Sequence, residues 1–582
     1  MRLPKGVADV FIKTTRANNY EYIKLVESYR ESGTTKHRVL YNFGRADLIK
    51  RDASFLNVVR KLCEIMGIAT EHNTPMNPQR IFGNCGEAEL YNYGYLAYLR
   101  LWKDMGIETI LEELQSGCTK TQYSIADTVF LMAVQQLLNP GSKLATYRRQ
   151  NRYVNLKEIS LQHLYRSLDK LCDWKEDIET ELFKHNYIRM NQKVDVVFYD
   201  VTTFAFESVV SDGLRDFGYS KDCKFNEVQV VMGMIIDTNG MPVGYELFPG
   251  NTFDGKTMVS ALQNIQRRFG IHRVIIVADR GINSKNNLNL IKKAGYGYIM
   301  SSRIKKMGAA TQAQILGEEG FTVVTDSKGS EDFRYKTLPY THVVTDEEGI
   351  RHQLEENLIV SYSPKRAKKD RKDRERLVEK AAELLKHPER IKSSNKRGGK
   401  KYIDPVTNES MEWTLASEKI EKDARFDGYY GIQTSELSMT ATDVVDAYHT
   451  LWKIEESFRI MKSTMEVRPV FHWTPDRIRG HFVLCFLAFL TERKLELVLK
   501  GEKDEISASP DRIQESLNAM QLTAVVTDSH DEFFIRVKPD PLGCKIFRLL
   551  KMKLPQAVNK KDDLAACFRL DDGFSQNQIS LC

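Results

Sequence analysis

The sequence predicts a mixed α/β core flanked by mainly helical regions, and three observations support this fold class. Two apolar runs typical of buried strands, VVFYD and VIIVAD, end at Asp200 and Asp279. Between them, Asn239–Gly240 separates two further apolar runs, which is a strong signal for a tight β-hairpin. Ser284 and Gly295 then bracket a helical segment as its N-cap and its stop. The expected order is three strands in a meander, then helix, strand, helix and strand.

The first 190 or so residues predict other elements. Two strand-like runs, YEYIKLVESYR and HRVLYNFGR, are joined by a hairpin loop at Ser32–Thr35. Later segments such as ADTVFLMAVQQLL carry apolar residues at helical spacing. The segment LQHLYRSLDKL fits either a DNA-reading helix or an ordinary core helix, and the sequence leaves both interpretations open.

Composition excludes several classes of protein. The chain has 582 residues, of which 42% are hydrophobic and 28% charged, as expected for a soluble globular protein. Its longest apolar run, Phe482–Leu490, is too short to span a bilayer, so no membrane partner is expected. The nine cysteines are scattered without a Cys-x-x-Cys pair, which argues against a disulfide framework or a zinc ribbon. With no signal-peptide pattern at the N-terminus, a reducing cytoplasm is the expected location.

Positive charge is concentrated in one segment. The formal net charge is only +7. Residues 365–401, however, contain sixteen Lys and Arg against six Asp and Glu. We call this segment the basic block. Such a block is usually a solvated face, but it is also a candidate contact for a phosphate backbone.

The segment YHTLWKIEESFRIMK is predicted to be one helix. Its residues Tyr448, Glu455 and Lys462 recur every seven positions, and a helix drifts only ~20° per heptad, so they are expected on nearly one face. Glu456 is expected to point about 100° away from Glu455. Substituting Glu456 by Ala should therefore reduce activity less than substituting Glu455. A surface helix with ordinary charge pairs is the alternative interpretation.

Two strand-end carboxylates and one helical carboxylate together suggest metal-dependent chemistry. Two divalent ions roughly 3.5–4 Å apart can activate a water or hydroxyl and stabilise the leaving oxygen in phosphoryl transfer. Mg²⁺ uses a few carboxylates and keeps waters and substrate phosphates as its other ligands. Taken singly, each Asp fits a strand-end turn residue better than a ligand. Together with Glu455, Asp200 and Asp279 favour a site.

These residues resemble the DDE transposases of bacterial insertion sequences, in the branch with a Tyr-x2-Arg-x3-Glu-x6-Lys signature. The matching pieces are FYDVTT, GYELFPGNTFDGKT, VADRG and the late signature. Tyr448, Glu455 and Lys462 match that signature, whereas Leu451 stands where the family has Arg. The resemblance covers roughly residues 194–490. It implies a ribonuclease H-like catalytic domain in which Asp200, Asp279 and Glu455 bind the metal and carry the catalysis.

The resemblance also implies partners and cofactors. The substrate would be double-stranded DNA, namely the terminal inverted repeats of the element and a target, held by a homodimer in the bacterial, nucleoid-associated cytoplasm. The cofactor would be Mg²⁺, with Mn²⁺ as a substitute. Cut-and-paste cleavage and strand transfer would proceed through a DNA hairpin. The residues expected to contact DNA are Tyr448, Trp452, Lys462, Arg280, Arg459, Lys365, Arg366, Lys368, Lys369 and Trp413.

The expected domain organisation follows from these patterns. A catalytic core with a β-containing insertion lies between a mainly helical N-terminal region and a helical C-terminal region. The boundaries are 1–84 for an N-terminal hairpin and helix region, 85–193 for a helical region that binds DNA ends, 194–302 with 440–470 for the core, 303–439 for the insertion with the basic block, and 471–582 for the C-terminal region.

Two other functions are kept as alternatives. Gly250–Thr257 satisfies the P-loop pattern G-x4-G-K-[ST], which would make the protein an NTPase. Asp254 weakens that interpretation, because it would bring a carboxylate toward the phosphates, and so does the hairpin linkage of the preceding strand. The second alternative is an inactive, DNA-binding derivative of a transposase.

Overall fold

The computed structural model of the chain divides into two compact units. Unit 1 comprises Met1–Ser167 and Lys494–Cys582, and unit 2 comprises Leu168–Arg493. The residues that the structure describes are 9–17, 20–31, 34–50, 52–66, 90–118, 121–188, 196–206, 208, 210–218, 227–252, 261, 263–264, 267–269, 275–278, 283–325, 331–345, 349–391, 398–406, 412–467, 472–501, 508–526, 532–560 and 564.

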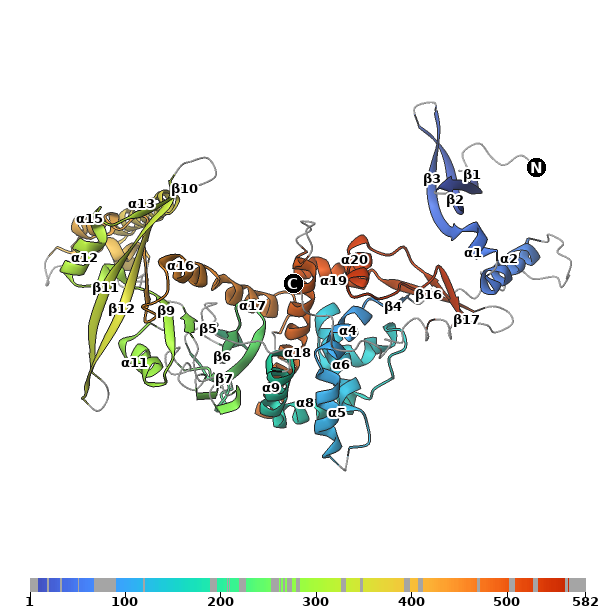
Figure 1. Ribbon diagram of the computed structural model, residues 1–582, viewed down its shortest axis with the longest axis horizontal. Helices are drawn as coiled ribbons and strands as arrows, with labels where there is room; N and C mark the ends of the chain where they lie inside the picture. The colour runs from blue at the N-terminus through green and yellow to red at the C-terminus, as the bar shows by residue number, and fades with distance from the viewer. Residues whose placement is uncertain are drawn as a thin grey trace. The chain divides into compact units, whose positions relative to one another are not determined.

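Unit 1 begins with a three-stranded antiparallel sheet (Figure 1). The hairpin predicted around Ser32–Thr35 is confirmed by the pairing of β2 (Tyr20–Glu31) with β3 (Thr34–Arg45). Strand β1 (Asp9–Ala17), which pairs with β2, was not predicted. The short helix α1 (Ala46–Ile49) and helix α2 (Ala53–Ile65) follow.

Helices and a second sheet make up the rest of unit 1. The helical spacing predicted for ADTVFLMAVQQLL is confirmed by α6, whose N-cap is Ser124. The second sheet has the order β18-β17-β16-β4. Its members and the neighbouring helices are α4 (Leu96–Asp104), α5 (Ile107–Ser116), α6 (Ile125–Leu138), α7 (Lys143–Arg149), the 3-10 turn η1 (Gln150–Arg152), α19 (Pro510–Asn518), α20 (Pro541–Leu549), β4 (Leu90–Asn92), β16 (Gln521–Val526), β17 (Glu532–Arg536) and β18 (Val558–Lys560).

The expectation of a helical C-terminal region is therefore only partly right. Strands β16, β17 and β18 lie within residues 521–560. Their formation depends on a partner far away in sequence, because β16 pairs with β4 through Gln521↔Asn92 and Leu522↔Tyr91. Such non-local pairing leaves little trace in a local hydrophobic pattern.

Unit 2 is built on one mixed sheet. Strands β5 (Val196–Ala205), β6 (Gln229–Ile236) and β7 (Pro242–Pro249) form the predicted antiparallel meander. Gly240 lies in the turn between β6 and β7 at φ +85°, a left-handed conformation that favours glycine. On its other edge β5 pairs in parallel with β8 (Ile275–Ala278), which pairs in parallel with β9 (Gly297–Ser301).

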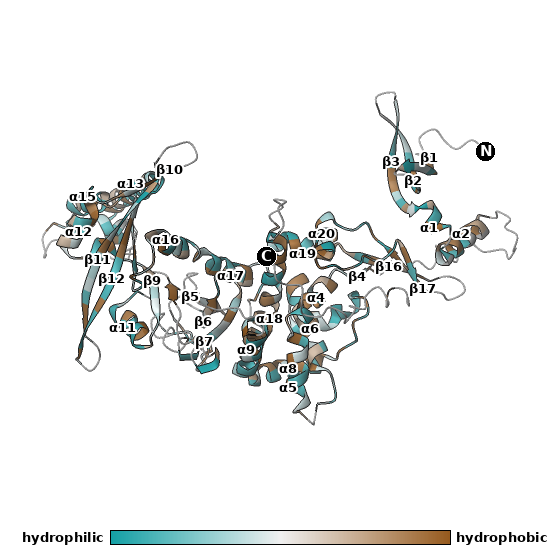
Figure 2. Cartoon of the chain, viewed as in Figure 1, coloured by the Kyte–Doolittle hydropathy of each residue, from teal (hydrophilic) through white to brown (hydrophobic). Residues whose placement is uncertain are grey.

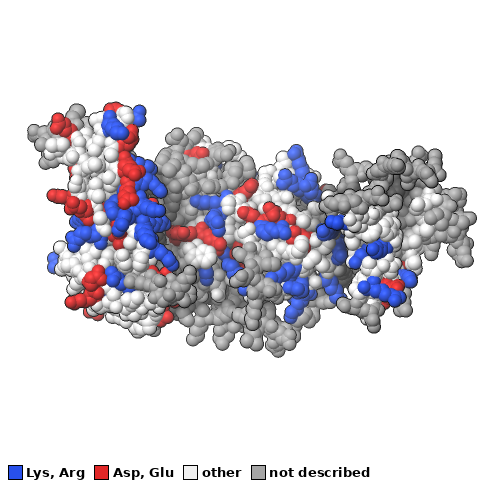
Figure 3. Space-filling model, turned by 90° about the horizontal axis from the view of Figure 1, so that it is seen from above, with Lys and Arg blue, Asp and Glu red and all other residues white. Residues whose placement is uncertain are grey.

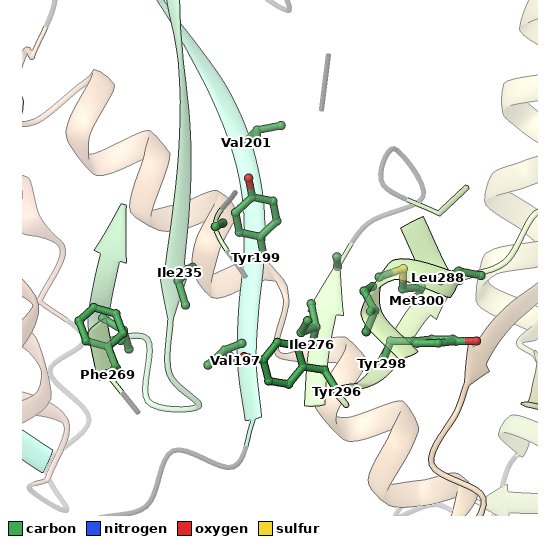
Figure 4. Close-up of a cluster of buried hydrophobic side chains, with 14 of the residues drawn as sticks. Val197, Tyr199, Val201, Ile235, Phe269, Ile276, Leu288, Tyr296, Tyr298 and Met300 are labelled. Carbon is green, nitrogen blue, oxygen red and sulfur yellow. The ribbon is translucent and has the colours of Figure 1, made fainter. Parts of the chain in front are cut away.

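The predicted helix before β9 is also confirmed. Helix α11 (Lys285–Lys293) begins after Ser284, whose side chain accepts a hydrogen bond from the Asn287 N–H, and the chain turns at Gly295 with φ +81°. Buried side chains from β5, β6, β8, β9 and α11 form a hydrophobic core cluster of this sheet (Figure 4). Val197, Ile276 and Tyr298 are among its members.

The insertion continues the same sheet. Strand β15 (Tyr429–Thr434) pairs antiparallel with β9 and with β12 (Arg351–Tyr362), so the full order is β10-β11-β12-β15-β9-β8-β5-β6-β7. Strands β11 and β12 carry both hydrophilic and hydrophobic residues (Figure 2). The other elements of the insertion are the 3-10 turns η3 (Ile304–Lys306) and η4 (Gly399–Tyr402), helices α12 (Ala309–Leu316), α13 (Pro364–Leu385), α14 (Pro388–Ile391) and α15 (Ser417–Ala424), and strands β10 (Thr322–Thr325), β11 (Glu331–Thr345), β13 (Ile403–Pro405) and β14 (Trp413–Leu415).

Helices precede and follow the sheet of unit 2 in the sequence, and the first and last of them run across the unit boundaries at Leu168 and Arg493. Helices α8 (Leu161–Asp173) and α9 (Lys175–Phe183), with the π-helical turn η2 (Lys184–Ile188), precede the sheet. Leu164, Leu168 and Leu171 of α8 are buried, as the core-helix interpretation expects. Helices α16 (Ala441–His449), α17 (Trp452–Lys462) and α18 (Pro475–Lys500) follow the insertion. Among the described residues, no helix is long and apolar enough to cross a membrane.

Candidate active site

Asp200 lies on β5, an interior strand of the unit 2 sheet between β8 and β6. From Val197 to Ala205 every residue of β5 is buried except Asp200, which is partly exposed. Its neighbours Tyr199, Thr202 and Thr203 are buried, as expected of residues that support the strand. Full burial of a carboxylate without a partner is costly, and Asp200 keeps part of its surface accessible to solvent.

The end of β8 lies beside this position. In the parallel pairing, Ala278 is opposite Tyr199, the residue that precedes Asp200. Asp279 follows Ala278 in sequence, but Asp279 and Arg280 lie outside the described residues. Among the described residues, no group of three or more His, Cys, Asp or Glu could hold a metal ion.

The predicted single helix from Tyr448 to Lys462 is wrong in one respect, because the chain forms two helices. Tyr448 belongs to α16, and Glu455 and Lys462 belong to α17. At the junction the N–H of Leu451 bonds the Tyr448 carbonyl, an i to i+3 bond in place of the helical i+4 bond. The Thr450 hydroxyl also donates to the Asp446 carbonyl at 2.8 Å, and this kind of back-bonding often bends helices.

Helix α17, which carries Glu455, packs against the strand that carries Asp200. The helix packs against β5, and the Lys462 ammonium lies 5.7 Å from the centroid of the Phe204 ring on that strand. Glu455 is exposed in the first turn of α17, whereas Ile454 and Phe458 are buried. The structure thus places two of the three predicted carboxylates on elements in contact.

Glu456 has a different role from Glu455. Its carboxylate accepts a hydrogen bond from the guanidinium of Arg493 on α18 at 3.1 Å, and the same guanidinium donates to the Ser457 hydroxyl at 3.1 Å. The Arg493 side chain is 2% exposed. This contact fixes the rotation of α17, so that Glu456 faces α18 and Glu455 faces outward. The expectation of a milder effect at Glu456 came from helix geometry alone and did not consider its ion pair with Arg493.

A second contact fixes the start of α17. The Lys453 ammonium donates to the Thr238 carbonyl at 2.6 Å, in the turn between β6 and β7. That turn is held by Asp237, which accepts from the N–H groups of Asn239 and Met241 at 2.8 and 2.9 Å. Burial raises the pKa of Asp237, and hydrogen bonds from Met241 and Tyr187 oppose the rise. Lys453 is therefore committed to the turn.

Leu451 and Arg459 also have defined positions. Leu451 is buried at the junction of α16 and α17, where an arginine would lose its solvation. Arg459 is exposed and lies 3.6 Å from Glu456 on the same helix. Arg459 is therefore the better candidate for a phosphate contact near Glu455.

Tyr448 connects α16 to the insertion. The Tyr430 hydroxyl on β15 lies 2.7 Å from the hydroxyl oxygens of both Tyr448 and Ser301, so the three form a hydrogen-bonded chain. The Arg366 guanidinium of the basic block stacks over the Tyr430 ring, 4.3 Å from its centroid. Two predicted DNA-contacting residues, Tyr448 and Arg366, are thus brought to the same tyrosine. The sequence around Tyr448 and Arg366 did not predict their contacts with Tyr430.

The two tryptophans differ. Trp452, one turn before Glu455, has 52% of its surface exposed, which fits a contact residue better than a core residue. Trp413 on β14 is partly buried and packs against a small core of the insertion that contains Tyr402 and Ile403. Within the described residues Trp413 thus has a packing contact, and its expected DNA contact stays a prediction.

The first part of the basic block forms helix α13. Figure 3 shows Lys and Arg gathered over the insertion, with acidic residues among them. Lys365 pairs with Asp332 at 2.8 Å. Lys368 and Lys369 are exposed and form no ion pair with residues that the structure describes. Of the four basic residues singled out in the sequence, Lys368 and Lys369 are thus most available to an anion.

Sequence reasoning missed Arg493, Ser457 and Tyr430, which position the predicted residues. Arg493 alone carried a usable signal, since an arginine near the end of an otherwise apolar run needs a buried acidic partner.

The P-loop segment is described only as far as Asn251 and Thr252, and Lys256 lies outside the described residues. The preceding strand β7 is antiparallel to β6, as expected from the hairpin.

Comparison with known proteins gives two family matches. Residues 192–490, just over half of the chain, match the model of the transposase DDE domain. Residues 11–70 match the N-terminal domain of IS1634 family transposases. A search of curated proteins finds no match.

Similar solved structures share little sequence with the chain. The piggyBac transposase synaptic complex with hairpin DNA is 10% identical, with a TM-score of 0.34 over 73% of this chain and 79% of that one. A pre-cleavage Mos1 transpososome is 13% identical, with a TM-score of 0.14 over 35% and 67%. The Mos1 mariner paired-end complex with Mn is 14% identical, with a TM-score of 0.14 over 46% and 77%.

The ion pair between Glu456 and Arg493 makes a prediction about stability. Glu456→Ala leaves the buried guanidinium without its carboxylate, which should lower the free energy of unfolding by about 3 kcal/mol. Glu456→Gln retains an acceptor oxygen and should cost less. Glu455→Ala, at an exposed position, should change stability by less than about 0.5 kcal/mol. Urea unfolding of the three variants measures this, and a larger loss for Glu455→Ala than for Glu456→Ala would contradict the helix rotation described here.

Proposed function

The chain belongs to the DDE transposases and is a DNA transposase, and we propose that Asp200, Asp279 and Glu455 are its catalytic carboxylates. The observation that carries this proposal is the packing of α17, with Glu455 exposed, against β5, where Asp200 alone among residues 197–205 is not buried. The end of β8 at Ala278, beside Tyr199, supports Asp279 as the third member.

We propose that the catalytic domain is ribonuclease H-like. The five strands in the order β7-β6-β5-β8-β9 support this, with β5, β6 and β7 antiparallel and β5, β8 and β9 parallel. The insertion between β9 and α16 extends this sheet by β15, β12, β11 and β10. The elements that carry the proposed carboxylates are then the first strand, the fourth strand and a helix after the insertion.

The carboxylates of Asp200, Asp279 and Glu455 are the groups that would hold Mg²⁺, or Mn²⁺ in its place. Oxygen ligands of this kind suit these ions. Bound there, the ions would supply Lewis-acid activation of the attacking oxygen and charge stabilisation at the leaving oxygen. The partial exposure of Asp200 and the exposure of Glu455 fit ligands that must also admit a DNA phosphate.

The proposed chemistry has two stages on one DNA end. Water first attacks the scissile phosphodiester, and the P–O3′ bond breaks to give a 3′-hydroxyl and a 5′-phosphate. The 3′-hydroxyl then attacks a phosphodiester of the opposite strand, forming a new P–O bond as another breaks, which closes a hairpin. Resemblance to the Tyr-Arg-Glu-Lys branch supports the hairpin stage. Lys462 and Arg459, on the helix of Glu455, are suited to hold the phosphates during both stages.

The remaining assignments are part of the same proposal. Residues 85–193 bind the element's terminal inverted repeats, residues 303–439 contribute phosphate contacts, and the protein acts as a homodimer when synapsed on DNA in the bacterial, nucleoid-associated cytoplasm. A P-loop NTPase is less well supported, because β7 is an edge strand in an antiparallel hairpin, whereas a P-loop strand normally lies in a parallel sheet.

The carboxylates give the first test. Asp200→Asn, Asp279→Asn and Glu455→Gln should each reduce cleavage of a labelled element end by roughly 10³-fold or more, because each removes several kcal/mol of transition-state stabilisation. Binding of the same DNA should persist. Asp446→Asn, which changes an exposed carboxylate on α16, is the matched control and should cleave normally. Wild-type cleavage by Asp200→Asn or Glu455→Gln would refute the assignment.

The basic block gives a second test. Lys368→Gln with Lys369→Gln should weaken binding to duplex DNA and lower the slope of log affinity against log salt by about 1.8, since each lost contact removes ~0.9. The charge-conserving pair Lys368→Arg and Lys369→Arg should keep the slope. If both double variants bind like the wild type at every salt concentration, α13 is a solvated face.

Trp452 gives a third test. Stacking on an unpaired base is worth ~1–3 kcal/mol, so Trp452→Ala should preserve the first nick and slow hairpin closure. The control is Trp473→Ala, a second tryptophan in unit 2 with 72% of its surface exposed. Nicked and hairpin products are measured separately on one labelled end. An equal loss of both products, with a lowered melting temperature, would leave Trp452 as a packing residue.

A further inference from the structure

Unit 1 contains a cavity lined mainly by Asn, Gln and Arg, from segments of the sequence that do not include the proposed catalytic carboxylates. Its volume is about 760 Å³. Cavities of roughly 300–1,000 Å³ suit ligands of drug size, so this one can hold a nucleotide but cannot enclose a duplex. The lining residues are Leu90, Tyr91, Asn92, Gln135, Asn139, Arg149, Asn151, Arg152, Tyr153, Asn518 and Gln521.

The cavity is built by segments from both ends of the chain. Asn92 on β4 pairs with Gln521 on β16, and its amide donates to the Leu517 carbonyl at 2.8 Å. The Asn139 amide donates to the Asn518 side chain at 3.2 Å. On the opposite side of β4, Asn92 forms a bridge with Tyr153. The walls are thus tied together by hydrogen bonds and do not depend on a ligand to form.

The chemistry of the lining selects an anion. Six of the eleven lining residues are Asn or Gln, two are Arg, and none is Asp or Glu. Arg149 and Arg152 form no ion pair or side-chain hydrogen bond with residues that the structure describes. An unpaired pair of guanidiniums at a cavity wall is suited to bind phosphate. The absence of carboxylates from the lining makes a metal a poor ligand.

The buried Tyr153 side chain supports this geometry. Its hydroxyl lies 3.1 Å from the Gln135 side-chain oxygen. Burial raises its pKa to about 12, and Asn139, Arg149 and Arg152 act in the opposite direction. Both guanidiniums line the same cavity as this phenol. The sequence between Asn139 and Lys157 adds to the positive field, because it contains five Lys and Arg and no acidic residue.

We propose that this cavity binds an unpaired nucleotide of a DNA strand, with its phosphate against Arg149 and Arg152 and its base edge against the carboxamides. Carboxamides can donate to and accept from base edges, and arginine can pair with phosphate in a bidentate manner. The proposal rests on the protein being a DNA transposase, and it adds a strand-binding site that is independent of Asp200, Asp279 and Glu455.

The test uses the full chain carrying Asp200→Asn and Glu455→Gln, so that binding is measured whether or not those residues are catalytic. The probe is a fluorescein-labelled single-stranded oligothymidine, titrated by anisotropy at several salt concentrations. Arg149→Gln with Arg152→Gln should lower the log–log salt slope by about 1.4, since each single-strand contact contributes ~0.7. Arg148→Gln, an exposed neighbour that does not line the cavity, is the control and should leave the slope unchanged.

Three binding results would overturn the proposal. The first is an unchanged slope for the double variant with an unchanged melting temperature. The second is an equal loss for Arg148→Gln and Arg149→Gln, which would indicate a diffuse basic surface. The third is binding of free dTMP that requires Arg149 while oligothymidine binding does not, which would assign the cavity to a small nucleotide.

Photo-crosslinking of the unsubstituted chain to a 5-iodouracil oligonucleotide should place the adduct at Tyr91 or Tyr153, and an adduct confined to unit 2 would contradict the site.

Discussion

The hydrogen bonding of β5 on both of its edges is the interaction on which unit 2 depends. One edge pairs antiparallel with β6 and the other in parallel with β8, so the strand cannot shift by one residue without breaking two registers. Such a shift would also move every buried side chain to the opposite face. Asp200 is therefore held at one height and on one face of the sheet. The proposed site follows from this constraint, because β8 and α17 are both positioned against β5.

Buried charge gives α17 the rotation that the site needs. Arg493 is almost completely buried, and its ion pair with Glu456 satisfies a cation that would otherwise be very costly. The adjacent carboxylate, Glu455, is left exposed. Two neighbouring glutamates thus have separate roles, one in holding the helix and one available to a ligand. Lys453 adds a second anchor at the β6–β7 turn.

Local chemistry made much of the catalytic sheet predictable. The Asn239–Gly240 turn, the Ser284 cap and the apolar runs each identify an element without reference to the rest of the chain. The break between α16 and α17 was not predictable from heptad spacing, because a spacing of seven residues is the same whether the residues lie on one helix or on two. Arg493, Tyr430 and the cavity of unit 1 depend on contacts between distant segments; Asn92 and Leu517, for example, are 425 residues apart.

The central claim is that Asp200, Asp279 and Glu455 share a divalent ion when DNA is bound. Anomalous diffraction from a crystal of the protein with a DNA end and Mn²⁺ tests this most directly. The account predicts an anomalous peak within coordination distance of the Asp200 and Glu455 carboxylates, with Glu456 still paired to Arg493. A peak coordinated by Glu456, or one remote from β5, would contradict it.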